Sequence, residues 1–216
     1  MIQRVIAYVY KRTLFRVYRS YVNEKHKKKL TNKNFSIISN NCIGGITCSD
    51  LDQPFNSPTV DCFFYSSCYI KFCQNLKYYF SQELVEVPES KYAGKCGYVV
   101  AHLDDIEIHF IHDQDFALAK EKWDRRKQRV NFDNLFFTMS DRDLCDESDI
   151  DAFLNIDKDR AVFFSAKKRS NANNFIYCYN EKGEITTPLF AMYRVFEKYF
   201  NMVEWLNTGS IKAGEK

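Results

Sequence analysis

Glycine and proline are scarce in this chain, with seven and four residues among 216. That scarcity argues against a β-propeller, a repeat array or a proline-rich linker protein. Long hydrophobic runs are also missing, because charged residues interrupt each stretch well before about 18 apolar residues accumulate, so no membrane-spanning helix is expected. The basic residues between Arg4 and Arg19 interrupt any apolar segment of a signal peptide, which predicts a cytoplasmic protein.

Several spacing motifs are missing as well. None of the eight cysteines forms a C-x-x-C pair, which argues against a zinc knuckle or a thioredoxin-like site. We therefore expect reduced and mostly buried thiols. The sequence contains no G-x-G-x-x-G, G-x-x-x-x-G-K-[ST] or G-x-S-x-G, so a dinucleotide fold, a P-loop and a nucleophile elbow are unsupported. The whole chain is 45% hydrophobic and 27% charged, a composition typical of a globular domain with a hydrophobic core.

Positive charge is concentrated at one end. Residues 1–34 hold ten lysines and arginines and one acid, a charge of +9, whereas the whole chain carries +3. Residues 2–24 are predicted to form a basic amphipathic helix, with an apolar stripe at Ile6, Tyr10, Leu14, Val17 and Tyr21. Such a helix either lies on an anionic membrane surface or packs on its own domain with its arginines in solvent. Nucleic-acid binding is not expected, because the basic charge is confined to this end.

Short apolar strands alternate with helices in the rest of the chain. The predicted strands are residues 35–39, 98–112 (broken near Asp104), 134–139, 161–165 and 175–179, and the predicted helices include 68–80, 115–129, 146–154 and one from Thr187 and Pro188 to Leu206. This alternation indicates an α/β fold of three layers, with a mostly parallel sheet flanked by helices. The expected organisation is a helical extension at 1–32, one α/β domain at 33–209 and a flexible tail at 210–216.

Polar residues follow three of the predicted strands, where parallel sheets bind ligands. They are Asn40 and Asn41, Ser140–Asp143, and Lys167 with Lys168. Asp141 and Asp143 have the spacing of a divalent-metal motif of nucleotide-sugar transferases, with Mg²⁺ or Mn²⁺ as the expected ion. A turn that caps a helix accounts for the same residues, and both interpretations stay open.

Other candidates lie outside the strand ends. Glu107 and His109 share one face of a predicted strand and form either an acid–base pair or the solvated face of an edge strand. Arg125, Arg126 and Arg129 form either a phosphate-binding cluster or a solvated helix face. Gly44 and Gly45 can bring backbone N–H groups close to an anion. Cys42 is disfavoured as a nucleophile, because no base lies near it in the sequence.

Several of these segments together resemble a bacterial family of exopolysaccharide biosynthesis proteins and domains of unknown function. The segments are Phe35–Gly45, Asn56–Pro58, Asp105–Phe110, Ala119–Arg129, Asn134–Phe136 and Asp141–Asp143. The resemblance covers residues 33–207 and implies a role in capsule, exopolysaccharide or lipopolysaccharide assembly, but it carries over no catalytic residue. An aromatic residue is expected after Asn41-Cys42, and Ile43 stands there instead.

Two functions fit these observations. The first is a glycosyltransferase, or another sugar- or phosphate-group transferase. Asn40, Asn41, Gly44, Gly45 and the three arginines would bind a nucleotide-sugar or lipid-linked saccharide, Glu107, His109 or Asp141 would act catalytically, and the basic helix would dock on the inner membrane face. The second is a non-catalytic, membrane-associated scaffold or regulator of polysaccharide assembly.

Overall fold

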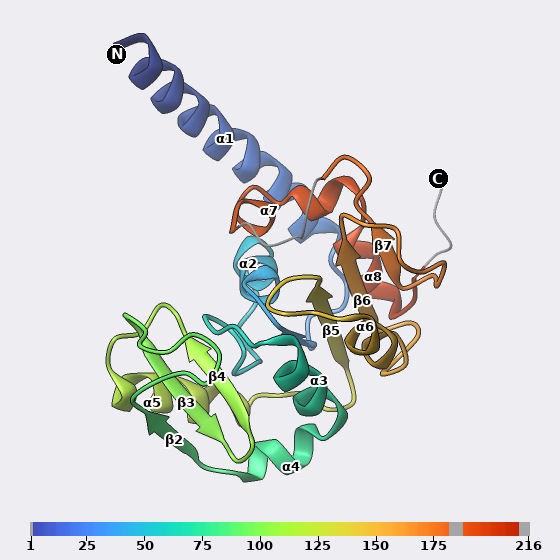
Figure 1. The fold of residues 1–216 in the computed structure, drawn as a ribbon. Helices are drawn as coiled ribbons and strands as arrows, with labels where there is room; N and C mark the ends of the chain where they lie inside the picture. Colours follow the sequence, from blue (N-terminus) through green and yellow to red (C-terminus); the bar gives the residue numbers. More distant parts are fainter. Residues whose placement is uncertain (1, 182–187, 212–216) are drawn as a thin grey trace.

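The computed structural model describes residues 2–181 and 188–211, and the side chains of 13–181 and 190–211. It confirms the predicted α/β class: a parallel four-stranded sheet lies between helices, and a three-stranded antiparallel sheet stands beside it (Figure 1). The parallel strands, in spatial order, are β1 (Ser36–Ser39), β5 (Leu135–Ser140), β6 (Ala161–Ser165) and β7 (Phe175–Tyr177). All three pairings are parallel, so the strand ends share one edge of the sheet.

Alternation along the central strands builds a separate core on each face of this sheet. Ile38, Phe137 and Phe163 face one core, and their neighbours Ile37, Phe136 and Phe164 face the other. The first core is covered by α3 (Ser66–Gln74) and α6 (Glu147–Leu154), and the second by α2 (Ile43–Asp50), α7 (Pro188–Met192), the 3₁₀ helix η1 (Val195–Lys198) and α8 (Met202–Thr208). Because both faces are covered, the strands are continuous apolar runs, as buried parallel strands require.

The second sheet was not predicted as a separate unit. It consists of β2 (Leu84–Val87), β3 (Val99–Leu103) and β4 (Ile106–Phe110), and the helices α4 (Leu76–Ser81) and α5 (Phe116–Lys127) flank it in the chain. The predicted break within 98–112 is a tight hairpin in which Asp104 has a φ of 57°. Leu103, Ile106 and Ile108 are buried in the same core as Phe163, so the two sheets share one hydrophobic interior.

The C-terminal helix differs from its prediction. The expected continuous helix to Leu206 is divided into α7, η1 and α8, and Arg194 takes a left-handed φ of 53° at the first break. The break lets the Arg194 guanidinium reach Asp50, with two N–O distances of 2.7 Å. Gly209 ends α8 with a left-handed φ of 65°. Thr187, where the predicted helix begins, lies outside the described residues.

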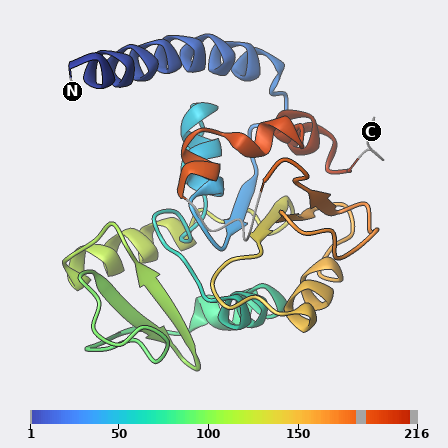
Figure 2. The same cartoon turned by 45° about the horizontal axis from the view of Figure 1, so that its top comes forward.

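The predicted basic helix is present and longer than expected, as α1 (Ile2–Lys29). It extends beyond the rest of the chain in two views (Figures 1 and 2). Its orientation reverses the simple prediction, because the apolar stripe members Leu14, Val17 and Tyr21 are exposed, whereas Arg19 is buried. Across the described residues, no helix combines the length and the hydropathy needed for a bilayer crossing.

Candidate functional site

The polar strand ends meet at the carboxyl edge of the parallel sheet, as predicted. Asn41 Nδ2 donates to Ser140 Oγ at 3.0 Å, and Ser140 N donates to Asn40 Oδ1 at 3.3 Å. Ser165 Oγ donates to Asp141 Oδ2 at 2.5 Å, which ties β6 to β5. Asn40, Asn41 and Asp141 are buried, so they hold the edge in one geometry as well as lining it.

Gly44 and Gly45 serve close packing. A Cβ on Gly44 would lie 3.1 Å from Ile37 Cγ2, and one on Gly45 would lie 3.0 Å from Val60 Cγ1. The first turn of α2 therefore approaches β1 more closely than a side chain would permit. Asn41 Oδ1 accepts a hydrogen bond from Ile43 N at 2.9 Å and satisfies one of the donors at the start of that helix.

Asp141 and Asp143 engage different partners. Asp143 has a φ of 60°, and its Oδ2 lies 2.5 Å from Arg142 Nε, whereas Asp141 bonds Ser165. No group of three or more histidine, cysteine, aspartate or glutamate side chains in the described part of the chain has the arrangement of a metal site. The metal role of this pair stays a prediction.

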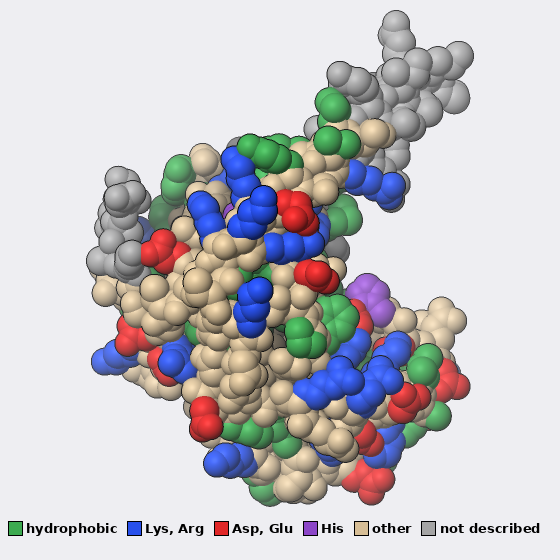
Figure 3. All heavy atoms as spheres, turned by 180° about the vertical axis from the view of Figure 1, so that it is seen from behind, with side chains coloured by type: hydrophobic (Ala, Val, Ile, Leu, Met, Phe, Trp, Pro, Cys, Tyr) green, Lys and Arg blue, Asp and Glu red, His purple; other side chains and the backbone are tan. Residues whose placement is uncertain are grey.

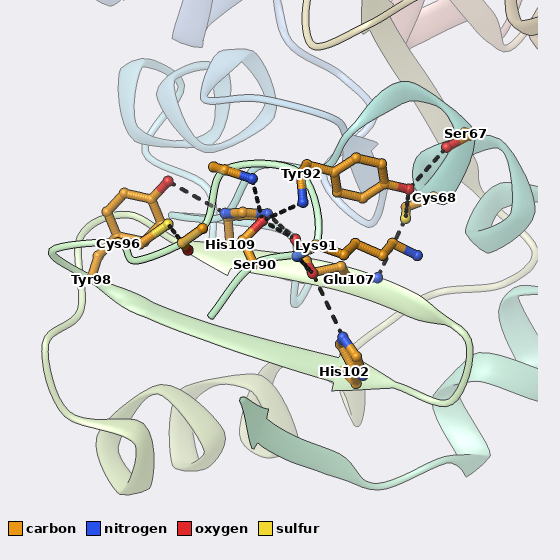
Figure 4. Close-up of polar contacts among 12 residues, drawn as sticks. Ser67, Cys68, Ser90, Lys91, Tyr92, Cys96, Tyr98, His102, Glu107 and His109 are labelled. Carbon is orange, nitrogen blue, oxygen red and sulfur yellow. Dashed lines mark hydrogen bonds and ion pairs between the residues drawn. The ribbon is translucent and has the colours of Figure 1, made fainter. Parts of the chain in front are cut away.

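Glu107 and His109 form a fully buried, hydrogen-bonded pair on β4 (Figure 4). His109 Nε2 lies 2.7 Å from Glu107 Oε1, and the same carboxylate accepts from Ser90 Oγ at 2.5 Å and from Lys91 N at 2.9 Å. Burial opposes the charge of Glu107, but these hydrogen bonds prevail and hold its pKa below its ordinary value. The solvated-face interpretation therefore fails, because the segment after β2 covers this face.

The second ring nitrogen of His109 links this pair to Tyr98, a less buried side chain. His109 Nδ1 lies 3.3 Å from the hydroxyl of Tyr98, a half-buried side chain. Burial lowers the pKa of His109, so the ring is neutral, and with Glu107 ionised we assign the ring proton to Nε2. Nδ1 then accepts from Tyr98, which completes a chain of hydrogen bonds from Glu107 through His109 to Tyr98. No sequence signal indicated Tyr98, because its partner lies across a hairpin.

One crossing segment joins this chain to the sheet edge. Phe63 exchanges both backbone hydrogen bonds with His109, at 2.9 and 3.0 Å, and Phe64 N donates to Asn40 O at 3.2 Å. The Phe63 ring stacks on His109 with centroids 4.3 Å apart and holds the Arg142 guanidinium 5.7 Å from its centre. Tyr98 lies edge-on to the same ring at 6.4 Å. The segments that follow β1 and β5 thus meet His109 of β4 around Phe63.

A thiol and an imidazole lie at the same edge. Cys42 Sγ is 4.0 Å from His112 Nε2, a residue 70 positions later, so the base that the sequence did not reveal comes from the loop after β4. Burial raises the pKa of Cys42, although the positive charge of Arg142 opposes this. The thiol is therefore protonated, and Cys42 borders the site without being an activated nucleophile.

The three arginines of the α5 region have different surroundings. Arg126 is buried, donating to Val60 O at 2.8 Å and to Asp61 Oδ2 at 3.1 Å. Arg125 is exposed and pairs with Glu121 on its own helix at 2.9 Å, and Arg129 is exposed beyond the helix end. The guanidinium at the sheet edge is instead that of Arg142, which lies between the two aspartates of the predicted motif.

The fold and this edge define an α/β protein whose polar groups collect where the parallel strands end. The chain belongs to the family described as a domain of unknown function, DUF1919, whose model matches residues 14–207. That match begins within α1, so our expectation that residues 1–32 lie outside the family is wrong for residues 14–32. A Haemophilus influenzae protein described as uncharacterized is 34% identical over 194 residues, covering 88% of this chain and 92% of that protein.

Proposed function

We propose that this protein transfers a sugar or phosphate group during surface-polysaccharide assembly, with its site around Phe63 at the carboxyl edge of the parallel sheet. The observation that carries the proposal is the meeting of the strand-end polar groups with the Glu107–His109–Tyr98 chain through one crossing segment. Open α/β sheets bind ligands at this edge. The assignment to polysaccharide assembly rests on the family resemblance.

Each group has a role suited to its surroundings. Arg142, whose side chain is partly exposed beside the Phe63 ring, binds the phosphate of a nucleotide-sugar or lipid-linked saccharide. Tyr98 accepts the proton of the attacking hydroxyl while giving its own proton to His109 Nδ1. The freed oxygen bonds to the transferred group, and the donor phosphate leaves with the bonding electron pair. Glu107 positions His109 and stabilises the imidazolium that forms.

A ligand screen tests the proposal. We would measure thermal unfolding with nucleotide sugars and nucleoside diphosphates, with and without Mg²⁺ or Mn²⁺. A ligand at about 100 times its Kd adds roughly 2.7 kcal/mol to the unfolding free energy, a shift of several degrees. Dependence of that shift on the metal ion would support the predicted role of Asp141 and Asp143.

Two arginine variants locate the site. The thermal shift should be lost in Arg142→Gln, because Arg142 lies against the Phe63 ring. It should be retained in Arg125→Gln, because Arg125 is exposed and pairs only with Glu121 on its own helix. Equal shifts in both variants would contradict the placement at the sheet edge. A folded protein that no donor stabilises, lipid-linked saccharides included, would favour the non-catalytic scaffold.

A further inference from the structure

Two cavities lie beside α1, away from the candidate transferase site. One, of about 730 Å³, is lined on one side by α1 residues including Arg19, His26 and Lys29, and on the other by Tyr193, Lys198 and further residues up to Thr208. The second, of about 600 Å³, shares Arg19 and Arg194 and is bordered by Arg16 and Lys27. Both therefore lie between the basic helix and the C-terminal helices.

Positive charge dominates these cavities. Together their linings contain six lysines and arginines and three glutamates, and Asp50 also pairs with Arg19 and Arg194, so six positive charges face four negative ones and an anion is favoured there. Figure 3 shows lysine and arginine side chains gathered around the base of the projecting helix. No carboxylate of the described residues lies within ion-pair distance of Lys29 or Lys198, and both side chains are exposed at the rim of the larger cavity.

Arg19 supplies a buried donor between the two cavities. Its side chain is 8% exposed, its Nη1 bonds Glu197 at 2.5 Å and its Nε bonds Asn23 at 2.5 Å. Its remaining terminal nitrogen, Nη2, is buried and has no hydrogen-bond partner among the described residues. A buried guanidinium N–H without a partner costs free energy, which a bound oxyanion would recover.

The outer surface of α1 carries apolar side chains next to this charge. Leu14, Val17, Tyr18 and Tyr21 are 51–66% exposed, and Tyr18 also lines the larger cavity. Their spacing along the helix places them on one face. An amphiphile would find a cationic pocket for its phosphate and an adjoining apolar stripe for its chains, an arrangement typical of helices that lie in a membrane interface.

We propose that α1 and the adjoining cavities bind the phosphate headgroup of an anionic membrane lipid. Arg19, Lys29 and Lys198 bind the phosphate oxygens, and Leu14, Val17, Tyr18 and Tyr21 enter the interface beside it. This gives the interfacial helix a specific headgroup pocket. The inference is independent of the transferase proposal, because none of these residues belongs to the site around Phe63.

The test is sedimentation of the full chain with phosphatidylcholine vesicles that contain or lack phosphatidylglycerol. We expect binding only when phosphatidylglycerol is present. Lys29→Gln/Lys198→Gln should weaken binding on the order of 100-fold, since two hydrogen bonds between charged groups are lost. The matched control is Lys28→Gln/Lys33→Gln, which removes the same charge from exposed positions outside both cavities and should weaken binding only a few-fold.

Several results would overturn the proposal. Equal losses in the two double variants would show general attraction of a basic helix and no pocket. If Val17→Ser/Tyr21→Ser left vesicle binding unchanged, the apolar stripe would have no part in membrane binding. Stabilisation by inorganic phosphate that depends on Lys29 and Lys198, without any binding to vesicles, would assign the pocket to a soluble phosphate. All substituted side chains are exposed, so the variants should keep the wild-type melting temperature.

Discussion

Glu107 and His109 are ionisable side chains without solvent contact, so their protonation links folding stability to pH. Burial lowers the pKa of His109 from its ordinary value of 6.5, so the unfolded chain binds more protons below that pH and stability falls as pH drops. The depressed pKa of Glu107 acts in the same direction, with a loss that begins below 4.5. We expect the denaturant midpoint to fall steadily from about pH 7 to pH 4.

Chemical denaturation across this range, for the wild type and His109→Gln, checks that expectation. The variant should show a shallower slope between about pH 7 and pH 5. Some slope should remain, because burial also lowers the pKa of His26. Identical slopes in the two proteins would show that His109 does not titrate with a lowered pKa.

Arg126 and Arg125 differ in burial, which gives a second prediction at the scale of single residues. Arg126→Ala removes hydrogen bonds to Val60 and Asp61 and leaves a buried carbonyl without its donor, so we expect a loss of about 2–3 kcal/mol in unfolding free energy. Arg125→Ala removes an exposed ion pair within one helix, with an expected change below about 0.5 kcal/mol. Urea denaturation measures both, and equal effects would contradict the structural role of Arg126.

At the scale of single elements, a glycine in α2 and a glycine in the loop before β3 differ in the space around them. Gly44→Ala would place a Cβ 3.1 Å from both Ile37 Cγ2 and Ser39 Cβ, so α2 must move away from β1. We expect a loss of about 1–3 kcal/mol, the usual cost of overpacking. Gly97→Ala is the control, because nothing lies within 4 Å of the added methyl group, and its unfolding free energy should be unchanged or slightly raised. A neutral Gly44→Ala would show that this packing is looser than the structure indicates.

The cap of α6 provides another prediction for a single element. Asp146 accepts from Asp149 N at 2.9 Å, and Asp149 accepts from Asp146 N at 3.3 Å, a reciprocal capping box. Asp146→Ala should lower the unfolding free energy by about 1 kcal/mol, whereas Asp146→Ser should retain most of it. Equal losses in the two variants would indicate that the cap does not act through the side-chain hydrogen bond.

For the whole molecule, the sequence predicts the features that depend on local patterns, namely the buried strands and the polar edge of the parallel sheet. The apolar runs at β5 and β6 identified buried parallel strands, and the polar residues after them identified the sheet edge. Contacts between distant segments were not predictable: Cys42 meets His112, and Arg19 is buried because Glu197 reaches it from the far end of the chain. The break at Arg194 was also hidden, since a left-handed arginine has no signature in the local pattern.

The central claim is that ligand binds around Phe63, where the two sheets meet. Hydrogen–deuterium exchange with and without the donor that stabilises the protein most tests it directly. We expect slower exchange in residues 40–46, 61–66 and 140–144, because these backbone segments border the site. Protection confined to α1 and the C-terminal helices, or no protection at all, would contradict the placement of the proposed transferase site at the carboxyl edge of the parallel sheet.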